Sequence, residues 1–311
     1  MSSPEQLGGS DPAPESQPKS VSKEESDLPI PKDLSWDEFS QLDPYNPKNP
    51  ANLKKALDQE AASLSAQAPE PSPEAETIFE RADILEAQEV MKEDFFGLAE
   101  IKQAFEVDLT EDEVPELPFS RSELEHFKAE GFFLSLRIDH DKDGHPLTLK
   151  QMKALYETDP QNPQTRIFYQ QDWYEKPANN DPFYDQQTPK IQWALTKKEI
   201  LPDSTGKNYQ TQENLLSQYA QAQAPHLEPN HEIQRREAVD IAYDQILAFR
   251  SKGIRLLPDK YDWSKTQLTQ GAYRGYCAYL GYFVSSGFLV NANHPDNDND
   301  SIGVCPSAVS S

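Results

Sequence analysis

The strongest hydrophobic periodicity of the chain lies in residues 232–250. Apolar side chains recur there at the spacing of one helix face, at Val239, Ala242, Tyr243, Ile246 and Leu247. Gly253 lies three residues after Arg250, in a position where glycine commonly ends a helix. The pattern therefore predicts a helix over residues 232–250.

Two shorter amphipathic stretches cover residues 78–90 and 94–105. The apolar stripe of the first stretch leaves Ile84 to one side and consists of Ile78, Phe79, Ala82, Leu85 and Val90. An amphipathic helix must bury its apolar face against something. We interpret residues 76–117 as a helical segment that either precedes the folded domain or joins copies of the chain into a homo-oligomer through residues 76–107.

The main folded domain is expected to begin near Pro118. Residues 122–126 have the sequence of a capped helix start, residues 132–138 alternate as a strand does, and residues 147–156 have a helical pattern. Apolar runs between Pro-, Asn- and Asp-rich turns predict short strands at 167–169, 172–174, 182–184 and 191–195, and a strand-rich end at 272–309. Residues 118–311 are therefore predicted to form an irregular α+β domain.

Residues 1–75 have a different composition from the rest of the chain. They contain 12 of the 26 prolines, together with many serine and acidic residues and few aromatic ones. Such a segment cannot bury enough apolar area to offset the entropy of its chain. We predict that these residues are disordered.

Acidic residues are concentrated in the first part of the chain. Residues 1–120 contain 28 acidic and 9 basic residues, and the remaining 191 residues contain 25 and 20. A phosphate-binding surface needs clustered Lys and Arg, so we expect no nucleic-acid partner. The N-terminus lacks the basic and apolar regions of a secretory signal, and no run approaches the roughly 18–20 apolar residues of a membrane span. We expect a cytoplasmic protein without a membrane partner.

The C-terminal quarter of the chain carries several short motifs in a fixed order. A helix is followed by Trp263-Ser-Lys-Thr266, by the aromatic run 273–279, by Asn293-His-Pro-Asp296 and by Ile302-Gly-Val304. This order resembles the end of the formylglycine-generating enzyme family and of its relatives with the C-type lectin fold. The resemblance covers residues 230–311 and implies a C-type-lectin-like domain at the C-terminus. In those relatives an Arg follows the closing strand, and here Cys305 stands in its place.

The copper-dependent oxidases of that family use two cysteines five residues apart, and this chain does not retain the pair. Cys277 matches the second of the two, and Ala272 stands where the first would be. A single thiolate cannot provide a two-sulfur site for copper. We therefore expect no copper, no other cofactor and no catalytic residues. Cys277 and Cys305 are expected to be ordinary buried thiols.

The same region is also similar to proteins that are diversified by retroelements. Those proteins carry a C-type-lectin-like domain whose last strands and loops are altered by adenine-directed mutagenesis, which changes Asn codons into codons for Tyr, Asp, Ser, His and Gly. Residues of this kind are concentrated here at Tyr273, Tyr276, Tyr279, Tyr282, Ser285, Asn291, Asn293, His294, Asn297 and Asp298. Between them stand residues that we interpret as a fixed framework: Gly271, Leu280, Phe283, Gly287, Leu289, Val290, Ile302, Gly303 and Val304.

This resemblance implies non-catalytic binding of a protein or another macromolecule through a variable face. Tyr supplies a large contact area at a low entropic cost, and Ser and Asn supply adaptable hydrogen bonds. The tyrosines are spaced by three, which is incompatible with strict strand alternation. Some of them are therefore predicted to lie in turns or bulges. The alternative is that they form the outer face of an ordinary sheet.

Three further interpretations remain open at the level of sequence. Asp139, Asp141 and Asp143 match the opening of a calcium-binding loop, but Lys150 occupies the twelfth position, where a bidentate Glu is expected, and a polar strand-to-helix turn fits better. The enzymatic alternative is a degenerate relative of the formylglycine-generating family, or a hydrolase with paired carboxylates that uses Asp172 or Asp262, each beside a tryptophan. The chain is alternatively a structural scaffold that assembles through its helices.

Overall fold

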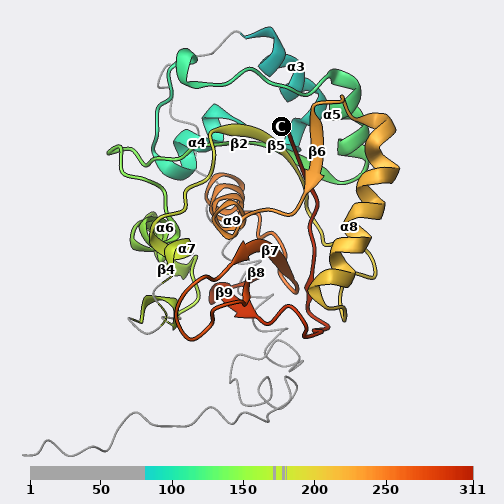
Figure 1. The fold of residues 1–311 in the computed structure, drawn as a ribbon. Coiled ribbons are helices and arrows are strands. Elements are labelled where there is room, and N and C mark those ends of the chain that lie inside the picture. The colour runs from blue at the N-terminus through green and yellow to red at the C-terminus, as the bar shows by residue number, and fades with distance from the viewer. Residues whose placement is uncertain (1–80, 171–172, 177–178, 180, 311) are drawn as a thin grey trace, which may run out of the picture. The chain divides into compact units, whose positions relative to one another are not determined.

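Helix α9 (Ala238–Lys252) lies at the centre of the molecule, between two sheets (Figure 1). The computed structural model describes residues 81–170, 173–176, 179 and 181–310, and the predicted disorder of residues 1–75 lies outside this part of the chain. Twelve of the fifteen residues of α9 are buried. The helix is therefore buried on most of its surface, and it ends at Gly253, which has a left-handed φ of 68°.

The start of α9 differs from the prediction. Residues 232–234, which we placed inside the helix, belong instead to strand β6 (His231–Gln234). Glu237 then serves as the N-cap, and its backbone N–H donates to Asp240. Strand β6 pairs with a strand more than 70 residues later, and helical periodicity contains no sign of such a partner.

A five-stranded sheet covers one side of α9. Its order is β1 (Phe95–Phe96), β2 (Phe132–Arg137), β5 (Gln192–Lys197), β11 (Ser307–Ser310) and β6. Strand β1 is parallel to β2, and the other neighbours are antiparallel. The last strand of the chain is thus inserted in the interior of the sheet. Strand β2 was predicted correctly, and all six of its residues are buried.

A four-stranded sheet covers the other side of α9. Its order is β10 (Ile302–Gly303), β7 (Tyr261–Gln267), β8 (Cys277–Val284) and β9 (Gly287–Asn293), with β10 parallel to β7 and the rest antiparallel. The strand-rich C-terminal end is confirmed. Residues 302–304 do not form the closing strand that we expected, because β11 follows them in the other sheet.

The remaining helices lie around these layers, which gives an α+β architecture (Figure 1). They are α3 (Ala82–Met91), α4 (Leu98–Phe105), α5 (Arg121–Ala129), α6 (Leu149–Tyr156), α7 (Pro182–Asp185) and α8 (Tyr209–Gln223). A two-stranded sheet, β3 (Thr158–Asp159) and β4 (Asn162–Arg166), completes the regular structure together with short 3-10 turns at 92–94, 111–113, 173–175 and 224–226. Helices α5 and α6 confirm the predictions at 122–126 and 147–156. Helix α8 was not predicted, because Gln212 and Leu216 are its only buried residues.

Helices α3 and α4 belong to the same core as the sheets. In α3, Ile84 is buried and Leu85 is 45% exposed, so our assignment of the apolar stripe was wrong at both positions. Ile101 and Phe105 of α4 are fully buried in the core that also contains the interior of α9. The described residues before 118 are therefore part of the compact unit that extends to the C-terminus, and the boundary at 117/118 is wrong.

The aromatic region between residues 167 and 195 contains fewer strands than predicted. Phe168 makes a single bridge to Phe288, Trp173–Glu175 form a 3-10 turn, and Pro182 opens α7 after the N-cap Asp181. Proline at the first helical position and an Asp before it favour a helix start. Of the four predicted strands, the last corresponds to β5.

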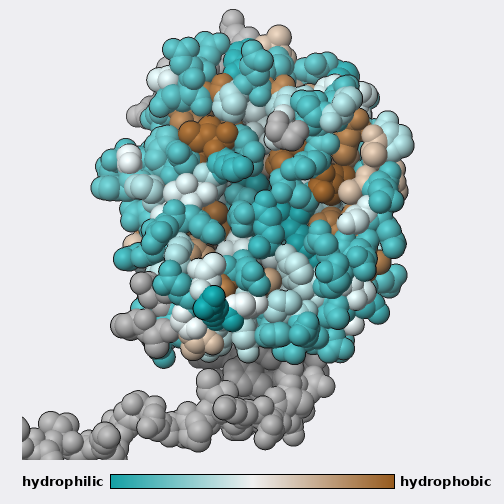
Figure 2. All heavy atoms as spheres, in the orientation of Figure 1, coloured by the Kyte–Doolittle hydropathy of each residue, from teal (hydrophilic) through white to brown (hydrophobic). Residues whose placement is uncertain are grey.

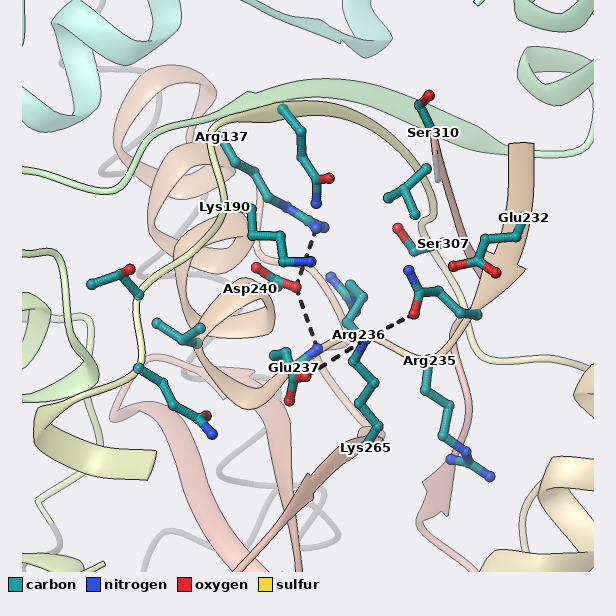
Figure 3. Close-up of a pocket in the computed structure, with 16 residues that line it drawn as sticks. Arg137, Lys190, Glu232, Arg235, Arg236, Glu237, Asp240, Lys265, Ser307 and Ser310 are labelled. Carbon is teal, nitrogen blue, oxygen red and sulfur yellow. Dashed lines mark hydrogen bonds and ion pairs between the residues drawn. The ribbon is translucent and has the colours of Figure 1, made fainter. Parts of the chain in front are cut away.

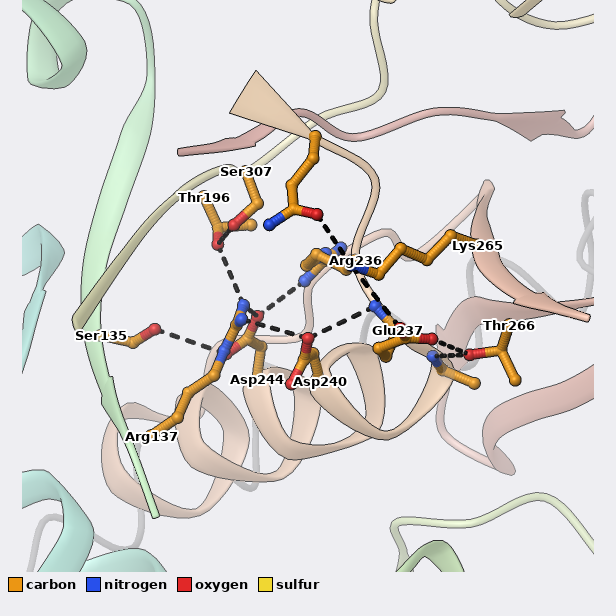
Figure 4. Close-up of polar contacts among 12 residues, drawn as sticks. Ser135, Arg137, Thr196, Arg236, Glu237, Asp240, Asp244, Lys265, Thr266 and Ser307 are labelled. Carbon is orange, nitrogen blue, oxygen red and sulfur yellow. Dashed lines mark hydrogen bonds and ion pairs between the residues drawn. The ribbon is translucent and has the colours of Figure 1, made fainter. Parts of the chain in front are cut away.

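A buried ionic cluster connects the layers (Figure 4). Asp244 of α9 accepts hydrogen bonds from Arg137 of β2 at 2.7 Å and from Arg236 at 2.8 Å. Arg236 also donates to Asp262 of β7 at 2.7 Å, and Arg137 lies 3.3 Å from Asp240. Charges removed from water need partners of this kind, so the cluster fixes the helix relative to both sheets.

Candidate functional site

A tight loop between β7 and β8 holds two of the predicted recognition tyrosines. The Leu268 N–H donates to the Tyr276 carbonyl, and the Gly275 N–H donates back to the Leu268 carbonyl, both at 2.8 Å. Tyr273 packs edge-on against Tyr276, with ring centroids 5.6 Å apart, and Trp173 supports Tyr273 from behind at 4.9 Å. Both tyrosines lie outside a regular strand, which confirms the prediction drawn from their spacing.

A second loop, residues 294–301, is held mainly through its backbone. The Tyr209 N–H donates to the Pro295 carbonyl and the Gly206 N–H donates to the Asn299 carbonyl, both at 2.9 Å. The side chains at the tip of the loop remain exposed, including Asp298. A loop fixed in this way keeps its shape when the exposed side chains change.

The two loops meet at one end of the four-stranded sheet. His294 lies edge-on to Tyr276 with ring centroids 5.3 Å apart, and the Asn293 side-chain oxygen accepts hydrogen bonds from the His294 N–H and the Asn297 amide, both at 3.0 Å. We call the group of Tyr273, Tyr276, Asn293, His294 and Asn297 the tyrosine–asparagine patch. The structure therefore brings together half of the ten residues that the sequence suggested.

Asp298 lies at the tip of the second loop, and the other four predicted residues lie along the β8–β9 hairpin. Asn291 is half-buried, Tyr282 lies at an irregularity of the hairpin with a left-handed φ of 54°, and Ser285 is exposed in the turn. Six residues of extended chain separate Tyr282 from Tyr276, which corresponds to about 20 Å. A single small ligand cannot contact both ends of this face.

Tyr279 does not fit the predicted face. It is only 7% exposed and packs against Tyr261, with ring centroids 5.0 Å apart, and burial raises the pKa of its phenol. Tyr279 points to the outer side of the sheet, as strand alternation requires, but neighbouring aromatic residues cover it. We therefore leave Tyr279 out of the candidate site.

Tyr261 belongs to the aromatic cluster around Tyr279, and we did not predict it. It packs against Tyr279 and stacks on Tyr282 at 5.6 Å. Tyr261 stands two residues before Trp263, which opens the motif that we quoted, and this alternation would have revealed an aromatic outer face on β7.

The residues that we interpreted as framework lie mostly in the interior. Leu280, Phe283, Val290, Ile302 and Val304 are at most 2% exposed, and Gly287 and Gly303 are also buried. Leu289 is half-buried and Gly271 is exposed, so these two do not follow the prediction. Leu280 pairs with Val290 in register, and both pack toward the core that contains α9.

Neither cysteine has the surroundings of a reactive or metal-binding thiol. Both are free and buried, and burial raises the pKa of Cys277 to about 11. A thiol with that pKa is almost entirely protonated at neutral pH and is a poor nucleophile and a poor metal ligand. The expectation of ordinary buried thiols is confirmed.

The acidic residues that we considered for catalysis or metal binding are occupied by the fold or lie outside the described residues. Asp262 accepts hydrogen bonds from Arg236 and from the Cys305 N–H, and Asp172 is outside the described residues. Asp141 accepts from the Asp143 and His145 N–H groups and from Gln151, and it closes a turn between β2 and α6. Asp141, Asp143 and His145 lie close together, but the two hydrogen-bonded oxygens of Asp141 serve the turn.

Comparison with known proteins provides no assignment. No family model, curated protein or solved structure matches the sequence. Among the described residues, no helix has the length and apolar character needed to cross a membrane.

Proposed function

We propose that this protein is a non-catalytic recognition protein with a C-type-lectin-like C-terminal domain, and that a diversity-generating retroelement alters its ligand-binding face. The face consists of the tyrosine–asparagine patch extended by Asn291 and Asp298 and, at the far end of the hairpin, by Tyr282 and Ser285. Its partner is a protein or another macromolecule, since a face of this length exceeds the reach of a small molecule.

One observation supports this proposal most directly. Along β8 and β9, side chains that pack on α9 are apolar and fully buried, while the predicted variable residues other than Tyr279 lie on exposed turns, loops or the outer side. Backbone hydrogen bonds fix both loops that carry the patch, and the Asn293 side chain adds a bond to the His294 N–H. Backbone bonds do not depend on side-chain identity, so the face tolerates substitution while the core does not.

Two libraries of variants test whether the face tolerates substitution and the core does not. The first randomises the five patch residues, and the second randomises Leu280, Phe283, Val290, Ile302 and Val304. We expect most members of the first library to melt within about 4 °C of the parent, which corresponds to about 1–2 kcal/mol for a domain of this size. We expect most members of the second to be unfolded, because removing large buried side chains costs about 2–5 kcal/mol each.

Selection from the first library then tests binding itself. Selection from the displayed library should yield variants that bind an arbitrary folded protein. These variants should lose affinity when their patch residues are replaced by alanine. Equal loss of folding in the two libraries would refute the proposed division between framework and face.

The retroelement part of the proposal has a separate test in the genome. We expect a reverse transcriptase gene nearby and an imperfect repeat of the codons for residues 273–298, with mismatches at adenines of the template and confined to codons of the face. Mismatches that fall equally in framework codons, or no repeat, would contradict it.

A further inference from the structure

A polar pocket of about 310 Å³ lies between the five-stranded sheet and the first turn of α9 (Figure 3). Gln192 of β5, Ser307 of β11 and Glu232 of β6 contribute from the sheet, and Glu237 and Asp240 contribute from the start of the helix. Figure 2 shows hydrophilic residues across the centre of this side of the molecule. None of the pocket residues belongs to the recognition face, so the pocket is independent of the proposed function.

The buried ionic cluster beneath the pocket contains one more carboxylate than cation, and of its three carboxylates Asp240 lines the pocket. The buried cluster consists of the carboxylates of Asp240, Asp244 and Asp262 and the guanidinium groups of Arg137 and Arg236. Asp244 and Asp262 are bound at 2.7 or 2.8 Å, while Asp240 contacts Arg137 at the longer distance of 3.3 Å. Asp240 is therefore the least neutralised of the three, and it faces the pocket (Figure 3).

Burial has a measurable consequence for Asp240. Loss of solvation raises the pKa of its carboxyl group, although the attraction of Arg137 opposes this rise. An ammonium group placed beside Asp240 would supply the missing positive charge. The side-chain oxygen of Gln187, which also lines the pocket, is buried without a hydrogen-bond partner among the described residues. A buried oxygen of this kind needs a hydrogen-bond donor. The Asp240 carboxylate and the Gln187 oxygen could therefore both accept a hydrogen bond from an N–H group of a ligand.

The rim of the pocket offers charges of both signs. Lys265 is paired with Glu237 at 3.5 Å, and Arg235 is paired with Glu213 at 2.7 Å. Lys190 and Glu232 also line the pocket, and neither forms an ion pair with any residue in the described part of the chain. After these pairs are subtracted, Lys190 and Glu232 are the rim charges without an ion pair to a described residue.

We propose that this pocket binds a small zwitterion of the amino-acid class. The ligand ammonium group lies against Asp240 and the Gln187 oxygen, and the ligand carboxylate is held by Lys190. The size of the pocket, at the small end of the range for ligand sites, suits a free amino acid. Charge-assisted hydrogen bonds at both ends of the ligand provide specificity against molecules with a single charge.

The test measures binding of the twenty amino acids to the full chain by thermal shift and calorimetry. Acetate and a simple alkylamine serve as probes that carry only one of the two charges. We expect at least one amino acid to raise the melting temperature in a saturable manner, and neither single-charge probe to do so at the same concentration. If no amino acid binds, or if one single-charge probe binds as tightly, the proposal is overturned.

Lys190→Met locates the site, because Lys190 is exposed and its replacement leaves the core intact. We expect a loss of affinity of about tenfold to a hundredfold, which corresponds to one charge-assisted hydrogen bond, with the melting temperature of the free protein unchanged. Lys150→Met, an exposed lysine on α6, is the matched control and should bind as the parent does. Unchanged binding by Lys190→Met would place any amino-acid site elsewhere.

Discussion

Glu123 shows how a single buried carboxylate supports the fold. It is 2% exposed, and its oxygens accept hydrogen bonds from the Ser120 N–H at 2.7 Å and the Glu228 N–H at 2.9 Å, with His231 at 2.6 Å. Burial alone would raise the pKa of Glu123, but these hydrogen bonds lower it below the usual value. The side chain thus caps α5 and ties the helix to β6.

The lowered pKa of Glu123 predicts a pH-dependent contribution to stability. The stabilisation is present above the pKa of the unfolded chain, about 4.3, and is lost as the pH falls through the lower pKa of the folded state. Glu123→Gln should therefore lower the free energy of unfolding by about 1–3 kcal/mol at neutral pH, and by less in acid, where the parent is protonated too. Urea denaturation at both pH values measures the difference.

Glu125→Gln provides the control for this experiment. Glu125 lies on the same helix but is exposed, and among the described residues it is paired with Arg121 alone, so its loss should change stability by no more than about 0.5 kcal/mol. If Glu123→Gln destabilised the protein equally at neutral and acidic pH, the carboxylate charge would not be the cause.

The β8–β9 hairpin depends on a glycine at its turn. Gly287 has a φ of 97°, and a Cβ atom there would lie 2.4 Å from the Phe168 carbonyl carbon and 2.6 Å from the Tyr169 nitrogen. Backbone atoms cannot move aside as a flexible side chain can. We expect Gly287→Ala to lower the free energy of unfolding by about 3 kcal/mol or more, as the sum of left-handed strain and overpacking.

Gly275 separates these two contributions. Its φ of 88° is similar, but a Cβ atom at this position meets nothing within 4 Å. Gly275→Ala should therefore cost only the backbone strain, about 1–2 kcal/mol. Chemical denaturation of both variants gives the comparison, and equal losses would mean that the contact with residues 168 and 169 has no energetic effect.

At the scale of elements, local sequence patterns predicted the features that depend on neighbouring residues. They failed where an element depends on its tertiary contacts. The end of α9 was evident from Gly253, but its start was not, since β6 exists only through its pairing with β11. Helix α8 escaped notice because a helix with two buried residues has almost no apolar stripe. The buried framework of the hairpin was largely evident from its apolar spacing, whereas the burial of Tyr279 depends on Tyr261, which belongs to another strand.

The candidate site shows the same limit: features set by local spacing were predicted, and features set by contacts between distant segments were not. The tyrosine spacing indicated correctly that some of these residues lie in turns, because that inference needs only the period of a strand. The pocket beside Asp240 was not foreseen. Its lining comes from β5, β6, β11 and the start of α9, and no window of sequence contains them together.

The whole molecule depends on its last strand. Strand β11 lies between β5 and β6 and pairs with both, through Ala308 with Leu195 on one side and Ile233 on the other. Ser307, Ala308 and Val309 are buried, and the Ser307 hydroxyl is 3.0 Å from that of Thr196, which in turn accepts from Arg137 of the ionic cluster. Loss of β11 would separate β6 from the sheet and expose the cluster.

A chain that stops after Pro306 should therefore fail to fold as a unit, although it loses only five residues. We expect no cooperative urea transition and rapid proteolysis of the region that is otherwise folded, because the unpaired edges of β5 and β6 and the exposed charges cost more than the few kcal/mol of net stability. Ser310→Ala is the control, because Ser310 is half-buried and its hydroxyl accepts a long hydrogen bond of 3.5 Å from the Asn230 amide. If the shortened chain unfolded cooperatively at the urea concentration of the parent, the two sheets would be stable without β11. The layers around α9 would then fold independently of the C-terminal strand.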